Sequence, residues 1–186
     1  MSNNESVCSS GDSVNYYWRF CSTSNHIGET VINATEKLRK NGYTISGVLQ
    51  GDFEAQIEYL LELAEMGALK PIDHIKRIHR AKPLDLYEIR WDDLKVFRTE
   101  KASGLYSQAK VRLRLYMVEE GDNWVVGLYL HEKRVIKDNS GETNRLQDVE
   151  IDAAVKLCED CSDENWRVKE LETHRLREQR HPRGIR

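Results

Sequence analysis

The amino-acid sequence predicts an α+β fold, in which one strand and two helices precede an antiparallel sheet and a closing helix. Two patterns lead to this prediction. Apolar residues recur at helical spacing between residues 27 and 64, whereas apolar and polar residues alternate in several segments between residues 74 and 133. Helices and strands that are segregated along a chain are typical of α+β proteins. We therefore expect two layers, with the helix pair on one face of the sheet and the other face open to solvent.

The N-terminal part is expected to form a strand followed by the pair of helices. Residues 14–22 are aromatic and favour a strand. The first helix should end at Asn41-Gly42, because glycine readily adopts the left-handed conformation that closes a helix. Asp52 is a good N-cap for the second helix. The apolar positions are Ile27, Val31, Ala34 and Leu38 in the first helix, and Phe53, Ile57, Leu60, Leu61 and Ala64 in the second.

The sheet is expected to follow as a series of antiparallel strands. Residues 74–80 and 84–91 have strand character, residues 92–110 are ambiguous, and residues 111–117 and 124–133 alternate clearly. Successive side chains of a strand point to opposite faces, so one face should be apolar and the other should carry cations, carboxylates and aromatic rings. The expected core-facing residues are Tyr87, Ile89, Trp91, Val111, Leu113, Leu115, Met117, Trp124, Val126, Leu128 and Leu130.

The closing helix is expected to begin at about Asn144 and to bury Leu146, Val149, Ala153 and Leu157. A chain of this length is typical of one domain. The expected organisation is a disordered lead over residues 1–12, the domain over 13–161, and a charged, partly helical tail over 162–186.

The composition indicates a globular protein without a membrane segment. Hydrophobic residues make up 39% of the 186 residues, and charged residues make up 32%. No stretch approaches the roughly 18 apolar residues of a membrane span, and the N-terminus lacks the pattern of a signal peptide, so we expect a cytoplasmic location. The net charge is −3, but residues 71–147 hold 15 Lys and Arg against 12 Asp and Glu. This modest excess places the basic charge in the strand-rich middle of the chain.

Cofactor motifs are weak in this sequence. A P-loop and a dinucleotide-binding glycine motif are both missing, so we expect no cofactor. Cys158 and Cys161 form a single C-x-x-C pair without a second pair or a neighbouring histidine pair. We interpret them as two cysteines on one face of a helix, and no metal site is predicted.

Three segments of the predicted sheet and closing helix resemble a known protein family. They are "LYEIR" (86–90), "RLRLYMV" (112–118), and "VVGLYLHEKR" (125–134) followed by "EIDAAVKLCEDC" (150–161). In this order they are similar to the strands and closing helix of the RelE/HigB-type toxins of bacterial toxin–antitoxin pairs, above all the phage-derived HigB-like branch. The chain departs from that family in its longer connection over residues 92–110, its acidic balance, its C-terminal tail and the lack of a tyrosine near the C-terminus.

The resemblance implies a RelE-like two-layer fold and the activity of a toxin. Such toxins cleave mRNA on the ribosome without a metal, using the ribose 2′-hydroxyl as nucleophile, and a cognate antitoxin holds them inactive. The expected partners are therefore the antitoxin, mRNA and the ribosome, with no membrane involved.

This chemistry sets requirements on the side chains of the site. A base must take the 2′-hydroxyl proton, cations must stabilise charge on the phosphorus, and an acid must protonate the leaving 5′ oxygen. Arginine binds two phosphate oxygens at once, and histidine exchanges protons near neutral pH. Arg112 and Arg114 compete for the arginine of the family's second strand motif; counting back from Tyr116 slightly favours Arg114, and both are kept. The candidate catalytic residues are Glu88, Arg90, Arg112, Arg114, His131, Lys133 and Arg134, and the candidate RNA-backbone contacts are Lys76, Arg77, Arg80 and Lys82.

Other interpretations of the polar face remain open. The exposed face of a half-covered antiparallel sheet is normally polar, so these charges can simply contact water. The chain can also be a non-catalytic interaction module of this fold, or an inhibitor of a protein target like the ParE-type relatives. The acidic balance of the chain and the missing C-terminal tyrosine favour this alternative.

Overall fold

The computed structural model describes residues 6–81, 84–99, 106–119, 123–162, 166, 168, 170 and 171 of the chain. Its centre is a six-stranded mixed sheet with the strand order β1-β6-β5-β4-β2, and β3 pairs with β4. The strands are β1 (Asn15–Trp18), β2 (Tyr43–Thr44), β3 (Ile75–Arg77), β4 (Leu86–Thr99), β5 (Tyr106–Glu119) and β6 (Trp124–Glu132). The predicted α+β class is confirmed. The expected antiparallel sheet is wrong in one respect, because β1 runs parallel to β6.

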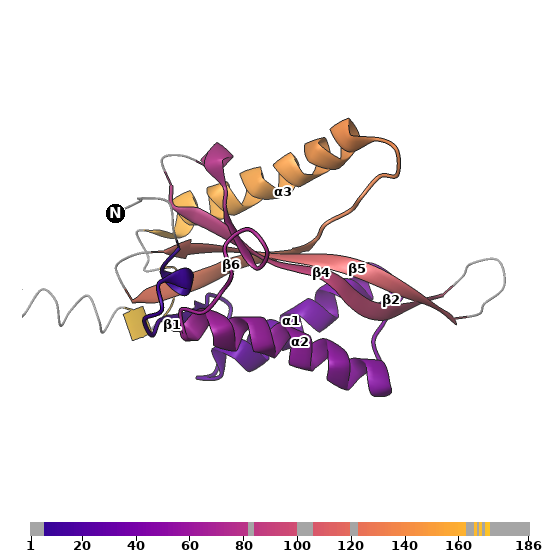
Figure 1. Cartoon of the computed structure of the whole chain (residues 1–186), viewed down its shortest axis with the longest axis horizontal. Helices are drawn as coiled ribbons and strands as arrows, with labels where there is room; N and C mark the ends of the chain where they lie inside the picture. The colour runs from indigo at the N-terminus through magenta and orange to yellow at the C-terminus, as the bar shows by residue number, and fades with distance from the viewer. Residues whose placement is uncertain are drawn as a thin grey trace, which may run out of the picture.

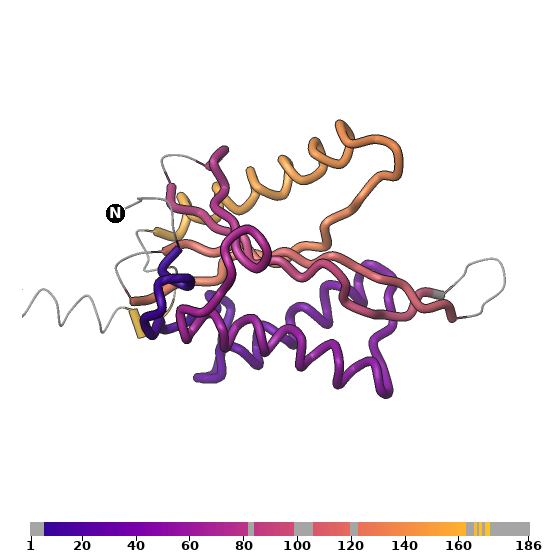
Figure 2. The backbone as a smooth tube through the Cα atoms, in the orientation of Figure 1, coloured from indigo at the N-terminus to yellow at the C-terminus, as the bar shows by residue number. Residues whose placement is uncertain are grey.

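Helices cover both faces of this sheet (Figure 1). The pair α1 (His26–Lys40) and α2 (Val48–Glu65) lies on one face, and α3 (Ser140–Cys161) lies on the other. The backbone trace shows the same three layers, with the strands between the helix pair and α3 (Figure 2). The expectation of two layers with one open face is therefore wrong. Two apolar clusters result, one between the helix pair and the sheet and one between α3 and the sheet.

The boundaries of the helix pair follow local capping chemistry. The side chain of Asn25 accepts a hydrogen bond from the Gly28 N–H and begins α1. The helix ends at Asn41, and Gly42 has a φ of 88°, as the Asn-Gly pair predicted. The second helix begins at Val48, earlier than the predicted start at Asp52. The predicted apolar stripe of α2 is nevertheless buried against the sheet.

The closing helix buries a different stripe from the predicted one. Asn139 caps its start by accepting a hydrogen bond from the Glu142 N–H. Val149, which was expected to face the core, is 57% exposed. The buried positions of α3 are Ile151, Ala154, Cys158 and Cys161. Cys158 and Cys161 therefore share the packed face of the helix, in agreement with their interpretation as packing residues.

The ambiguous segment 92–110 is the middle of a long hairpin. Strand β4 continues to Thr99 and pairs with β5 from Tyr106 onward, with an irregularity in register between Trp91 and Leu94. The hairpin extends beyond the helix pair at one end of the sheet (Figure 1). The segment is thus ordered strand over its described residues, and it lengthens one edge of the molecule.

A bulge in β6 changes which residues face the helix pair. Tyr116 lies opposite Tyr129, but Met117 lies opposite Gly127, so Leu128 is the extra residue. Val126 and Leu128 consequently pack in the cluster under α3 and not with the helix pair, where the regular alternation predicted them. Leu130 follows the bulge and does pack with the helix pair.

Both ends of the described chain contribute to the core. Cys8, within the predicted disordered lead, is fully buried next to the helix pair. In the predicted tail, Trp166, Val168 and Leu171 pack under α3 in the second cluster. The folded unit therefore extends beyond residues 13–161 in both directions. Among the described helices, none combines the length and the apolar character that crossing a lipid bilayer would need.

The N-terminal segment is attached to the end of β5 through Glu119. The Glu119 carboxylate accepts hydrogen bonds from the Ser6 hydroxyl and from the Val7 N–H, the latter over 3.1 Å. Burial raises the pKa of Glu119 to about 7, and the charge of Asp85 adds to this, whereas the two hydrogen bonds act in the opposite direction. A protonated Glu119 is thus favoured in the folded protein relative to the unfolded chain.

Glu119 should make the stability of the protein depend on pH. The ordinary pKa of 4.5 applies to the unfolded chain, so stability should fall as the pH rises from 4.5 to about 7 and then level off. The free energy of unfolding of Glu119→Gln should lose this dependence and exceed that of the natural protein at pH 8 by up to about 3 kcal/mol. Urea unfolding at pH 4.5 and pH 8 measures the effect. The exposed Glu58→Gln is the matched control, and identical pH profiles of the two variants would contradict the expectation.

Candidate functional site

Strand pairing brings the predicted polar residues together on the face of the sheet that α3 covers. Arg90 of β4 lies opposite Arg114 of β5, and Arg114 lies opposite His131 of β6. Glu88 lies opposite Tyr116, two residues along from the arginine pair. These side chains share one face because partners in an antiparallel ladder point to the same side.

Several of these residues are inaccessible to solvent. Glu88 is 2% exposed, and Arg114 and His131 are each 1% exposed. From α3, the Gln147 amide lies 3.4 Å from a Glu88 carboxylate oxygen. We call Glu88, Arg114, Tyr116 and His131 the buried polar cluster. The face that was expected to contact water is instead a polar layer enclosed between the sheet and α3.

Arg114 is the centre of this cluster. Its guanidinium donates to the main-chain oxygens of Trp91 and Leu113 over 3.1 and 2.8 Å, and to a carboxylate oxygen of Asp92 over 2.5 Å. Its Nε lies 4.0 Å from Glu88. Arg114 therefore compensates a buried carboxylate and fixes the position of Asp92, where the register of β4 is irregular. Partial burial would raise the pKa of Asp92, but the hydrogen bond and charge of Arg114 outweigh it and hold that pKa below its usual value.

His131 is unsuited to proton exchange near neutral pH in this position. Its Nε2 lies 3.1 Å from the Tyr116 hydroxyl, and the two rings are stacked. Burial lowers the pKa of His131 to about 3, and the nearby charge of Arg114 acts in the same direction. The imidazole is consequently neutral and packed within the buried polar cluster.

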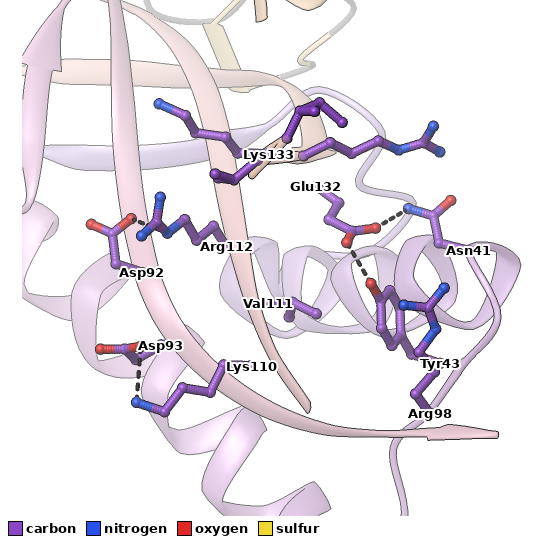
Figure 3. A pocket seen from close by; sticks show the side chains of 13 residues that line it. Asn41, Tyr43, Asp92, Asp93, Arg98, Lys110, Val111, Arg112, Glu132 and Lys133 are labelled. Atoms are coloured by element: carbon purple, nitrogen blue, oxygen red, sulfur yellow. Dashed lines mark hydrogen bonds and ion pairs between the residues drawn. The ribbon is translucent and has the colours of Figure 1, made fainter. Parts of the chain in front are cut away.

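An open groove lies beside this cluster, where β6 ends and the long hairpin continues (Figure 3). Its volume is about 790 Å³. We call it the basic groove, because its lining contains five Lys or Arg side chains and three carboxylates. The lining residues are Asn41, Tyr43, Asp92, Asp93, Arg98, Lys110, Val111, Arg112, Glu132, Lys133, Arg134, Val135 and Ile136.

Internal ion pairs compensate only part of the charge in the basic groove. Arg112 lies 3.8 Å from Asp92, and Lys110 lies 3.1 Å from Asp93. The third carboxylate, Glu132, accepts hydrogen bonds from the Tyr43 hydroxyl and the Asn41 amide. Within the described part of the chain, the remaining cations of the groove have no ion pair; they are Arg98, Lys133 and Arg134. Such an arrangement favours an anionic ligand.

Lys133 and Arg134 both reach the groove because β6 ends at Glu132. Two consecutive residues of a regular strand would point to opposite faces. Burial lowers the pKa of Lys133, and the charge of Arg114 acts in the same direction. The Lys133 amine therefore loses its proton more readily than an exposed lysine does.

The other predicted site residues lie outside the basic groove. Arg90 lies 3.6 Å from Glu88 of the buried polar cluster, donates to the Ile72 main-chain oxygen over 2.7 Å, and lines a separate cavity on the other side of Asp92. Lys76 is exposed on β3. Arg77 forms an ion pair with Asp85, and Arg80 contacts Asp148 and Asp152 of α3 at 3.6 and 3.1 Å. Lys82 lies outside the described residues, and the structure brings none of the described members of this group into the basic groove.

Sequence reasoning missed two cations of the groove, Arg98 and Lys110. Lys110 continues the alternation of Arg112 and Arg114 by one further step along β5, so extending that strand toward the N-terminus would have identified it. The sequence contains no comparable pattern that points to Arg98. Its place in the groove depends on the pairing of β4 with β2, where Arg98 lies opposite Tyr43.

Comparisons with known proteins assign no family to the chain. No protein-family model matches it, and no curated protein or solved structure is significantly similar to it. Among the described residues, His, Cys, Asp and Glu side chains form no group of three or more that could hold a metal ion.

Proposed function

We propose that the protein is a RelE/HigB-like toxin that binds mRNA in the basic groove and cleaves it on the ribosome in the cytoplasm. The observation that carries this proposal is the set of uncompensated cations around Lys133, whose pKa is lowered. The order of a strand, a helix pair, a strand meander and a closing helix also supports it, because the resemblance implies this order. A cognate antitoxin would hold the toxin inactive.

The groove can supply the chemistry of RNA cleavage with its own side chains. The ribose 2′-oxygen attacks the adjacent phosphorus, a new O2′–P bond forms, and the P–O5′ bond breaks to leave a 2′,3′-cyclic phosphate and a 5′-hydroxyl. Arg112 and Arg134 bind the phosphate oxygens and stabilise the additional negative charge. The unprotonated Lys133 amine takes the proton of the 2′-hydroxyl, and water gives a proton to the leaving 5′ oxygen. Arg114 acts as a positioning residue, since it fixes Asp92 and Asp92 in turn contacts Arg112.

Brief induction of the protein in a bacterial host, followed by mapping of transcript 5′ ends, tests this function. New 5′ ends inside translated regions are expected, and Arg112→Ala should remove them. Lys76→Ala is the matched control, because it removes an exposed cation outside the groove and should cut like the natural protein. Growth arrest with intact transcripts would contradict the proposal and favour a protein target, and no arrest would favour a non-catalytic binding module.

A further inference from the structure

The basic groove borders a strand edge that has no partner strand among the described residues. Strand β5 pairs with β4 from Tyr106 onward, but its pairing with β6 covers only Leu113 to Glu119. The last contact on the β6 side is the Lys133 N–H, which donates to the Arg112 main-chain oxygen over 2.8 Å. In the described chain, no other strand pairs with residues 106–111 on this side.

The direction of the main-chain groups along this edge follows from the Arg112 contact. The main-chain groups of Arg112 point away from β4, because its oxygen accepts the hydrogen bond from Lys133. Main-chain N–H and C=O groups in an antiparallel strand change side at each residue. The N–H and C=O groups of Gln108 and Lys110 therefore also point away from β4, into the space beside the groove. Unpaired groups of this kind are a template for another strand.

The side chains along the same edge determine which residue types an added strand should carry. Lys110 and Arg112 lie on one face of β5, two residues apart, and Lys133 lies in the lining of the same groove (Figure 3). Arg134 also lines this groove. An added strand places every second side chain opposite Lys110 and Arg112, and opposite charges at these positions stabilise the pairing. Acidic residues at alternate positions complement this edge. Partly exposed Val135 and Ile136 line the same groove and offer apolar contacts.

We propose that an extended acidic segment of a partner protein pairs with residues 106–112 of β5 and occupies the basic groove as an additional strand. The main-chain groups supply binding energy, and the alternating carboxylates supply selectivity. This binding does not depend on the proposed function.

Two synthetic peptides of equal composition test the strand pairing. The probe is an eight-residue peptide of alternating Glu and Thr, which presents all its carboxylates on one face of a strand. The control peptide has four Glu followed by four Thr. Fluorescence anisotropy with labelled peptides should show about tenfold tighter binding of the alternating peptide, because only that one pairs in register with Lys110 and Arg112. Amide exchange measured by NMR should slow at Gln108 and Lys110 when the alternating peptide binds.

Gln108→Pro separates strand pairing from charge attraction. The substitution removes one outward N–H, leaves the charge of the groove unchanged and spares the hydrogen bonds of the flanking residues to β4. It should weaken binding of the alternating peptide by about tenfold. Lys110→Glu should weaken it similarly without altering the main chain. Circular dichroism verifies folding of both variants.

Three results would overturn the proposal. These are equal binding of the two peptides, unchanged binding by a folded Gln108→Pro variant, or binding without slowed exchange at Gln108 and Lys110. The first two would leave only charge attraction, which a nucleic acid shares. If Gln108→Pro does not fold, the exchange measurement on the natural protein and the Lys110→Glu affinity decide the outcome. Because all these assays use purified protein without RNA, their failure is distinct from a failure to cleave transcripts.

Discussion

Replacing Arg114 with alanine is expected to lower the free energy of unfolding by about 3 kcal/mol or more. Arg114 is almost fully buried, donates to two main-chain oxygens, and holds Asp92. The buried Glu88 carboxylate lies between Arg90 at 3.6 Å and Arg114 at 4.0 Å, so the substitution removes one of these two cations. A buried carboxylate that loses a neighbouring cation is strongly destabilising, because the vacated space restores neither solvation nor charge attraction.

The matched control for Arg114→Ala is Arg112→Ala, two residues along the same strand. The Arg112 side chain is 47% exposed, and its contact with Asp92 spans 3.8 Å, so its loss should cost less than about 1 kcal/mol. Urea unfolding of both variants measures the difference. Equal stabilities would refute the role of Arg114 as the compensating charge of the cluster. The same difference affects how activity losses are interpreted. A loss of activity in an Arg114 variant reflects folding, whereas a loss in Arg112→Ala does not.

The sequence predicted the fold well where buried and exposed positions follow a regular period along a helix or strand. Tyr87, Ile89 and Trp91 alternate over a regular part of β4, and all three pack against the helix pair as expected. Asn41-Gly42 ended α1 as predicted, since the closing conformation depends only on local sterics. Such predictions succeed because period and capping are encoded within a few neighbouring residues.

The errors have one common origin, which is contact with distant segments. The bulge at Leu128 shifts the pattern of β6 by one residue, and its local signal in the β6 sequence is the adjacent Gly127, because a glycine within a strand often marks a bulge. The position of α3 over the polar face was hidden, because Ile151, Ala154 and Cys158 form a stripe no stronger than the predicted alternative around Val149. As a result, Glu88 and His131 were expected on a solvent-exposed face, whereas α3 encloses them.

The candidate site could be predicted only in part for the same reason. Arg112, Lys133 and Arg134 could be picked out as cations of the predicted sheet, but their common groove depends on where β6 stops and how far β5 continues. The structure also distinguishes the two candidate arginines, of which the sequence slightly favoured Arg114. Arg112 lines the groove, whereas Arg114 lies beneath it within the buried polar cluster.

Lys133→Ala is expected to reduce mRNA cleavage by about 10²–10⁴-fold, the usual contribution of a group that transfers a proton in the rate-limiting step. Lys133→Arg should lose as much, although it keeps the positive charge, because a guanidinium does not release its proton at any usable pH. Single-turnover cleavage of a short message on programmed ribosomes measures both variants. Lys76→Ala should cleave at the natural rate, since its side chain lies outside the groove.

The pH profile separates proton transfer by Lys133 from simple charge stabilisation. A base must be unprotonated, and burial lowers the pKa of Lys133, so cleavage by the natural protein should rise with pH and level off above that pKa. Because the pKa lies below that of an exposed lysine, the plateau should be reached earlier than for an ordinary amine. A Lys133→Arg variant that cleaves within about threefold of the natural rate would show that the positive charge alone is needed, since such a small change corresponds to less than about 1 kcal/mol in the barrier. In that case the proton must be taken by another group of the groove or by the ribosome.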